Sequence, residues 1–260
     1  HHSFLQYLPF LRHKHRLLLP LMPWATASLK PTDYDVIICS DAATIKGIKV
    51  QPGALKICYC HSPMRYVWDL YDDYRREAGL MAGTILAMVV PWLRRWDRRA
   101  AGTVTAFVAN SRYVRDRIMR HYNLPAVVIY PPVQVAPTPA TIAPENFYLV
   151  VSELVGYKRV DLAVRACTEL GRPLVVIGDG PRMSHLKKLA GPSVQLLGHQ
   201  NDTVVRDHYA RCRAFLFCGE EDFGLTPVEA QSHGRPVIAY GRGGACETVL
   251  DGRTGLWFSE

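Results

Sequence analysis

Two series of strand–helix units, separated by a proline-rich stretch, constrain the fold of this chain more than any other feature of its sequence. In the first series, apolar runs that predict strands occupy residues 35–40, 56–61, 106–110 and 127–130, and helices are expected over 65–76, 82–101 and 111–122, with a kink or break near Pro91. In the second series, strands are expected over 147–152, 173–179, 194–198, 214–218, 236–240 and 255–258, and helices over 159–170, 181–190, 203–211 and 226–233. This alternation predicts parallel sheets covered by helices, so we expect an α/β fold with two Rossmann-like halves.

The proline-rich stretch marks the expected boundary between the halves. Five prolines fall within the fourteen residues 131–144, with several threonines and alanines between them. Such a composition forms no regular element and is typical of a semi-rigid spacer. We therefore expect an N-terminal domain over residues 1–136, a linker over 137–146 and a C-terminal domain over 147–260.

The composition is that of a globular, basic protein. Hydrophobic residues make up 48% of the chain, which is enough for a substantial core. The net charge of +8 favours anionic partners such as nucleotide phosphates, lipid head groups or nucleic acid. Because we recognise no nucleic-acid-binding motif in the sequence, nucleic acid is the least favoured of these partners.

The cysteines and the apolar runs bear on the cellular compartment. The seven cysteines are scattered, and although Cys58 and Cys60 would point the same way in a strand, no second pair completes a zinc site. They are typical of small buried residues in a reducing cytoplasm. The longest apolar windows, 17–24 and 83–92, are too short or too interrupted by proline to span a bilayer. With no signal peptide recognised, we expect a cytoplasmic protein.

Residues 4–24 leave two interpretations open. Arg12, Lys14 and Arg16 lie among leucines and phenylalanine in this segment. The segment could be a helix and loop that cover a sheet, or it could be a basic and apolar face that contacts anionic lipid. The second interpretation would place the protein peripherally on the inner face of a membrane.

Residues 217–230 combine the end of a strand, an acidic loop and the start of a helix. Thr226 is expected to cap that helix and Glu229 to complete a capping box. In an open α/β sheet, ligands bind at such strand ends, and the N–H groups of a helix start suit a phosphate. The carboxylates of Glu221 and Glu229 would instead accept hydrogen bonds from hydroxyls. A phosphorylated sugar or a nucleotide would fit both features, although Glu229 taken alone is more often a cap than a ligand.

The amino-acid sequence of this region resembles the signature of glycosyltransferase family 4. That signature is a glutamate, a Phe-Gly-hydrophobic step and a second glutamate eight positions after the first, which Glu221, Phe223, Gly224, Leu225 and Glu229 match. The similarity continues through residues 230–247. The closest branch is that of the bacterial mannosyltransferases of surface polysaccharide synthesis.

The resemblance implies a GT-B architecture, in which two Rossmann-like domains face a cleft. Measured against the family pattern, both domains are expected to be incomplete. The strand–helix units and glycine-rich loop that precede position 4 in the family are missing, as are the helices that follow position 260.

The resemblance also assigns roles to individual residues. His61 would face the donor sugar, although a lone histidine is more often a satisfied structural residue. Lys158, helped by Arg159, would bind the donor diphosphate, and the family's usual arginine five positions earlier is replaced here by Glu153. Asn110 and Ser111 match a further family motif, and a plain helix cap accounts for them equally well.

The remaining assignments concern the donor. Glu221 would bind a hydroxyl of the donor sugar and Glu229 the ribose hydroxyls, while the other contacts would come from the backbone or the helix start at Gly178, Gly180, Phe223, Gly224, Leu225 and Thr226. The Gly-x-Gly pair of Gly178 and Gly180 is by itself weak evidence for a nucleotide-binding loop. Gly243 and Gly244 would let the backbone approach the ligand or would form a tight turn. No metal and no cofactor are expected, because the family uses a nucleotide sugar alone.

The family resemblance implies a retaining glycosyltransferase that moves a sugar to a glycan or polyprenyl-linked oligosaccharide, and the resemblance to the mannosyltransferase branch alone favours mannose from GDP-mannose. Two alternatives stay open. One is a non-catalytic sugar-nucleotide-binding or scaffold protein, which Glu153 would support. The other is an NAD-dependent enzyme, which would need the complete glycine fingerprint that this sequence does not have.

Overall fold

The computed structural model describes residues 3–7, 19–29, 31–134 and 142–259, and its chain divides into two compact units, His1–Tyr130 and Pro131–Glu260. Residues 137–141 of the expected linker lie outside the described residues, as do the cations at positions 12, 14 and 16 on which the lipid-contact interpretation of residues 4–24 depends. We call the two units the N-terminal and the C-terminal unit.

The N-terminal unit is built on a four-stranded parallel sheet. Its strands follow the order of the chain: β1 (Val36–Asp41), β2 (Leu55–Cys60), β3 (Ala106–Ala109) and β4 (Ala126–Val128). The helices are α1 (Met22–Ser28), α2 (Tyr71–Glu77), α3 (Gly79–Ala101) and α4 (Arg112–Tyr122), with short 3-10 turns η1 (Phe4–Tyr7) and η4 (Ile45–Gly47). The predicted strands and their parallel arrangement are confirmed.

Two predicted helices of this unit differ from the structure. The helix expected over 65–76 starts only at Tyr71, because residues 64–70 form turns in which the N–H of Leu70 donates to the carbonyl of Arg65. Met64 and Val67 of these turns are buried in the core.

In α3 the chain stays helical through Pro91, so the expected break is wrong. Pro91 is exposed, while Val90 and Leu93 anchor the helix on either side of it.

The described residues cover only one face of the N-terminal sheet. On that face, Cys58, Cys60 and Phe107 pack against buried residues of α4, including Val114 and Ile118. The alternate residues of the same strands point to the opposite face. On that opposite face, Val36, Ile38, Leu55 and Val127 are exposed.

A partly buried ion-pair cluster around Asp69 joins α4 to the turns that follow β2. The guanidinium of Arg117, which is almost fully buried, donates to Oδ2 of Asp69 from Nε at 2.9 Å and from Nη2 at 2.6 Å. His121 Nε2 lies 2.9 Å from the same oxygen. Burial acts to raise the pKa of Asp69, but the hydrogen bond to His121 and the charge of Arg117 outweigh it and lower that pKa to about 2.

The C-terminal unit is built on a six-stranded parallel sheet. Its strands are β5 (Tyr148–Val151), β6 (Leu174–Ile177), β7 (Val194–Gly198), β8 (Ala214–Phe217), β9 (Val237–Tyr240) and β10 (Gly255–Phe258), in the spatial order β10-β9-β8-β5-β6-β7. The chain moves outward from β5 through β7 and then returns to the other side of β5 at β8. This is the Rossmann strand order, with its topological switch point between β5 and β8.

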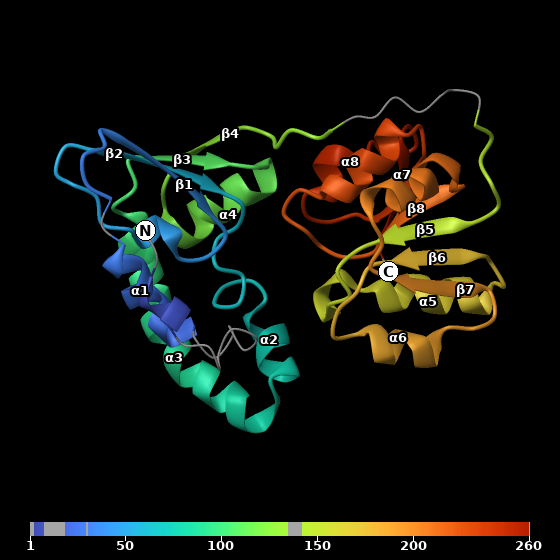
Figure 1. Cartoon of the computed structure of the whole chain (residues 1–260), viewed down its shortest axis with the longest axis horizontal. Coiled ribbons are helices and arrows are strands. Elements are labelled where there is room, and N and C mark those ends of the chain that lie inside the picture. Colours follow the sequence, from blue (N-terminus) through green and yellow to red (C-terminus); the bar gives the residue numbers. More distant parts are fainter. Residues whose placement is uncertain (1–2, 8–18, 30, 135–141, 260) are drawn as a thin grey trace. The chain divides into compact units, whose positions relative to one another are not determined.

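Helices cover both faces of this sheet (Figure 1). Beneath α5 (Val160–Glu169) and α6 (Met183–Leu189), the core contains Val150, Leu174 and Val176. On the opposite face, α7 (Asp202–Arg211), α8 (Leu225–Ser232) and the short α9 (Ala245–Thr248) enclose Leu149 and Phe215. Successive residues of the strands β5, β6 and β8 therefore enter different cores, which explains why these strands are continuous apolar runs in the sequence.

Candidate active site at the β5–β8 switch point

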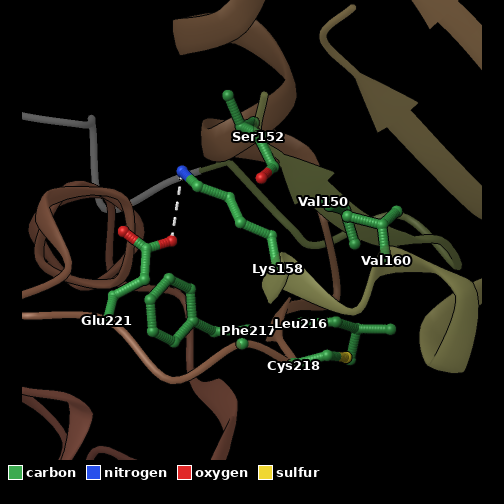
Figure 2. A pocket seen from close by; sticks show the side chains of 10 residues that line it. Val150, Ser152, Lys158, Val160, Leu216, Phe217, Cys218 and Glu221 are labelled. Atoms are coloured by element: carbon green, nitrogen blue, oxygen red, sulfur yellow. Dashed lines mark ion pairs between the residues drawn. The ribbon is translucent and has the colours of Figure 1, made fainter. Parts of the chain in front are cut away.

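The loops that leave β5 and β8 form a pocket at the carboxyl ends of the two strands (Figure 2). Its floor is apolar, and its polar groups come from the two loops. The lining residues are Val150, Val151, Ser152, Lys158, Val160, Leu216, Phe217, Cys218, Gly219 and Glu221. The pocket lies where the strand order reverses, which is the position at which open α/β sheets bind their ligands.

Two of the predicted site residues meet in this pocket. Lys158 ends a 3-10 turn (Gly156–Lys158) on the β5 side, and Glu221 lies in the acidic loop after β8. The Nζ of Lys158 is 3.2 Å from Oε1 of Glu221 (Figure 2). The two side chains are 18% and 20% exposed, so both are sheltered by the pocket and both can still reach a ligand.

Glycines allow the two loops to approach this closely. A Cβ at Gly219 would lie 2.7 Å from the Cα of Lys158, so any other residue would push the loops apart. On the other side of the acidic loop, the N–H of Gly244 donates to the carbonyl of Glu221 at 2.7 Å. Gly243 has φ +69°, and a Cβ there would lie 2.5 Å from the same carbonyl. Gly243 and Gly244 therefore brace the loop that carries Glu221.

Gly178 and Gly180 hold the loop that leaves β5. Their φ values are +137° and +156°, and a Cβ at Gly178 would overlap the carbonyl oxygen of Ser152 at 1.8 Å. Between them, the carbonyl of Asp179 accepts a hydrogen bond from the N–H of Leu154 at 2.8 Å. Both glycines thus have a structural role in backbone packing, and their predicted contact with a donor stays a prediction.

The start of α8 differs from its prediction. The helix begins at Leu225, its N-cap position is Gly224 with φ +84°, and the structure has no side-chain cap there. Gly224 adopts the left-handed conformation at little cost, and this turns the chain into the helix before Thr226 is reached. Thr226 lies inside the first turn, so its assignment as N-cap and the capping box with Glu229 are wrong. Phe223, just before the cap position, is buried.

Glu229 interacts with a buried tyrosine. The hydroxyl of Tyr209 on α7 donates to Oε2 of Glu229 at 3.0 Å, and the Tyr209 ring stacks on His233. Burial, reinforced by the negative charge of Glu229, raises the pKa of Tyr209, so its hydroxyl stays a donor. The sequence analysis missed Tyr209, whose only signal is a tyrosine on the apolar side of a predicted helix.

Arg159 and Glu153 lie beside this pocket but outside its lining. Arg159 is the N-cap residue of α5, in a left-handed conformation, and its Nε lies 3.5 Å from Asp161. Its side chain is about half exposed, at 52%. Glu153 is exposed. The structure therefore brings Lys158, and not Arg159, to Glu221.

His61 and Ser111 belong to the N-terminal unit. His61 directly follows β2, is half-buried, and has its Nε2 at 2.8 Å from the hydroxyl of Ser40. Ser111 is the N-cap of α4, and its Oγ accepts a hydrogen bond from the N–H of Val114 at 3.0 Å. The cap interpretation of Ser111 is confirmed, while the role of His61 stays a prediction.

Among the described residues, there is no group of three or more histidine, cysteine, aspartate or glutamate side chains that could hold a metal ion. Among the same residues, no helix is both long and apolar enough to cross a membrane.

Comparison with known proteins gives two family matches and several relatives. Residues 2–136 match the family described as Glycosyltransferase Family 4, and residues 139–260 match the one described as Glycosyl transferases group 1. The GDP-mannose-dependent alpha-(1-6)-phosphatidylinositol monomannoside mannosyltransferase of Mycolicibacterium smegmatis is 28% identical over 200 residues, which cover 64% of this chain and 52% of that protein. The chain spans about half the length of the curated relatives it matches.

Solved structures share the fold at lower sequence identity. TarM, from S. aureus, superposes with a TM-score of 0.67 and 16% identity over 92% of this chain and 48% of its own. HepE of Anabaena, in complex with UDP-glucose, gives a TM-score of 0.55 and 16% identity over 92% of this chain and 81% of its own. Two parallel Rossmann-like sheets, the glutamate signature and the match over residues 2–136 agree, and the chain belongs to glycosyltransferase family 4, whose members have the GT-B fold.

Proposed function

We propose that this protein is a retaining glycosyltransferase that transfers a sugar from a nucleotide-diphosphate sugar to a glycan or lipid-linked acceptor. The observation that carries the proposal is the pairing of Lys158 with Glu221 at the switch point between β5 and β8. A cation and a carboxylate, side by side in a sheltered pocket, match the two needs of a sugar nucleotide: neutralisation of its diphosphate and hydrogen-bond acceptors for its sugar hydroxyls.

Each residue has one proposed task. The ammonium of Lys158 faces the diphosphate and offsets the negative charge that builds on it as the sugar leaves. One carboxylate oxygen of Glu221 is 3.2 Å from Lys158, and the other is left to accept from a sugar hydroxyl. Glu229 accepts from the ribose hydroxyls, and Tyr209 fixes the orientation of its carboxylate. No protein nucleophile is invoked, because the leaving diphosphate can take the acceptor proton on the same face.

The family resemblance alone supports two further assignments. His61 is assigned to the donor sugar, and Gly178, Gly180, Phe223, Gly224, Leu225 and Thr226 are assigned to the backbone and helix-start contacts around the donor. Arg159 is the weakest donor ligand in this set, because its side chain is half-exposed beside Asp161.

GDP-mannose is the donor that we propose, since the mycobacterial relative is described as GDP-mannose-dependent. HepE, a structural neighbour, was solved with UDP-glucose, which makes a uridine nucleotide the competing donor. Thermal unfolding with GDP, UDP, ADP and their sugars separates the two. We expect GDP and GDP-mannose to give the largest rise in melting temperature.

A turnover assay with the protecting sugar nucleotide then tests transfer itself. Lys158→Ala should abolish most of the turnover, whereas Arg165→Ala, which removes an exposed cation of α5, should leave it intact. If no nucleotide raised the melting temperature of the folded protein, the proposed donor site would be rejected.

A non-catalytic sugar-nucleotide-binding protein is the second candidate. The exposed Glu153, which stands where the family usually has a phosphate-binding arginine, is the observation in its favour. A non-catalytic protein of this kind would be protected against heat by a sugar nucleotide, while no sugar would be transferred or hydrolysed. Glu153→Arg would then be expected to restore turnover, and no other candidate predicts that gain.

A further inference from the structure

The first half of α3 presents apolar side chains that do not enter the core of the N-terminal unit. Leu80 and Met81 lie in its first turn, directly after the tight turn at Gly79, and are 95% and 81% exposed. Ile85 and Met88 follow on the next turns and are also exposed. We name these four residues the apolar ridge. Figure 1 shows that the α2–α3 turn lies at the end of the unit away from its sheet.

Three of the four ridge residues, all except Leu80, lie on one face of an amphipathic helix. Met81, Ile85, Met88 and Trp92 recur at the i, i+4, i+7 and i+11 positions, which places them in one stripe along α3. The buried residues of the helix lie elsewhere on its circumference, at Gly83, Val90, Leu93, Asp97, Ala100 and Ala101. The helix therefore has one side for its own unit and a second apolar side that the described residues leave exposed.

The chemical type of the side chains in this stripe changes from one end of the helix to the other. After the apolar ridge comes Trp92, whose ring stacks on Trp24 of α1 at a centroid distance of 5.1 Å, with both rings partly exposed. Arg95 and Arg99 follow at three and seven positions beyond Trp92, on the same stripe, and both are exposed. From Met81 to Arg95 the helix rises by about 21 Å. Apolar, aromatic and cationic side chains thus follow one another along a single face.

This order matches the layers of a lipid surface. Apolar side chains enter the acyl boundary, tryptophans prefer the head-group level, and arginines bind anionic head groups. The one acidic residue of α3, Asp97, is buried and paired with Lys46 at 2.7 Å, so it does not offset the arginines of the exposed stripe. A symmetric dimer in which the two copies of α3 lie side by side and parallel would bring the arginines of both copies together, which opposes that arrangement.

We propose that the apolar ridge, with Trp24, Trp92, Arg95 and Arg99, docks the N-terminal unit onto an anionic lipid bilayer. The N-terminal turns of α3 enter the boundary between head groups and acyl chains, Arg95 and Arg99 stay at the head-group level, and the helix does not cross the bilayer. The surface belongs to a different unit from the sugar-nucleotide pocket, so this inference goes beyond the proposed function. Its test uses binding alone and does not depend on turnover.

The experiment measures sedimentation of the full chain with vesicles. Wild-type protein is mixed with phosphatidylcholine vesicles or with vesicles that also contain about a third phosphatidylglycerol. We expect sedimentation with the anionic vesicles and release by salt. Changing all four ridge residues to serine should lower the partition coefficient about tenfold or more. Arg95→Gln/Arg99→Gln should remove most of the preference for anionic over neutral vesicles.

A matched control uses exposed leucines of the other unit. Leu170 and Leu256 are similarly exposed, and their change to serine should leave sedimentation unaltered. Thermal unfolding of each variant shows whether it is folded, and ridge substitutions in exposed positions should leave the melting temperature nearly unchanged. Equal vesicle binding by the folded ridge variant and wild type would overturn the proposal. So would a ridge variant that only abolishes self-association in sedimentation velocity, because a second copy would then be the partner.

Discussion

Replacement of Lys158 by alanine is the sharpest test of the proposed site. A unit negative charge about 4 Å from Nζ is stabilised by about 4 kcal/mol at the effective dielectric constant of a site near a protein surface. If about half of that charge has developed in the transition state, the loss is about 2 kcal/mol, and full development gives about 4 kcal/mol. These limits correspond to a fall in kcat of about 30-fold to about 1000-fold.

The same substitution should have little effect on folding. The Lys158–Glu221 pair is about a fifth exposed, and ion pairs with solvent access contribute about 1 kcal/mol or less to stability. The assay therefore compares kcat for sugar transfer with the free energy of unfolding in urea, for Lys158→Ala and for the surface control Arg165→Ala. A near-normal kcat in Lys158→Ala would refute the reasoning, and a parallel loss in Arg159→Ala would show which cation has the role.

Three further predictions follow from the other contacts. Glu229→Gln should weaken nucleotide binding by about 1–3 kcal/mol in calorimetry with little change in melting temperature; a lower melting temperature at unchanged affinity would make Glu229 purely structural. Tyr209→Phe, which keeps the buried ring but removes the hydroxyl, should weaken the same binding by about 1 kcal/mol, and Tyr148→Phe should not. Asp69 has a folded-state pKa of about 2, below its usual value, so it stabilises the fold above about pH 4 and that contribution is lost as the pH falls toward 2. Urea unfolding of Asp69→Asn should show a smaller decrease over this range than wild type.

The strands of the C-terminal sheet could be predicted because a parallel strand that is covered on both faces is a continuous apolar run. Residues 214–218 and 173–179 are examples, and each contains a strand of the C-terminal sheet. The helix predicted over 65–76 starts too early, because residues 64–70 form turns. The buried side chains of Met64 and Val67 fix these turns, and tertiary packing of this kind overrides local propensity.

The cap of α8 shows a different limit of sequence reasoning. Thr226 followed by proline is a good local signal for a helix start, and the rule failed because Gly224 takes up a left-handed conformation two residues earlier. The sequence shows that a glycine is present but not its φ value. The glycines at 219, 243 and 244 are similar, because each is explained by a neighbouring backbone that comes from elsewhere in the chain.

The contact between Lys158 and Glu221 depends on the order of strands, which residue types do not specify. The family resemblance gave each residue a separate task, and only the adjacency of β5 and β8 places them 3.2 Å apart. Their substitutions should therefore not be additive, because each residue sets the charge that surrounds the other. In Lys158→Ala, the unpaired carboxylate of Glu221 repels the diphosphate. A part of the lost nucleotide affinity should return in Lys158→Ala/Glu221→Gln, and strictly additive effects would mean that the two side chains act on separate parts of the ligand.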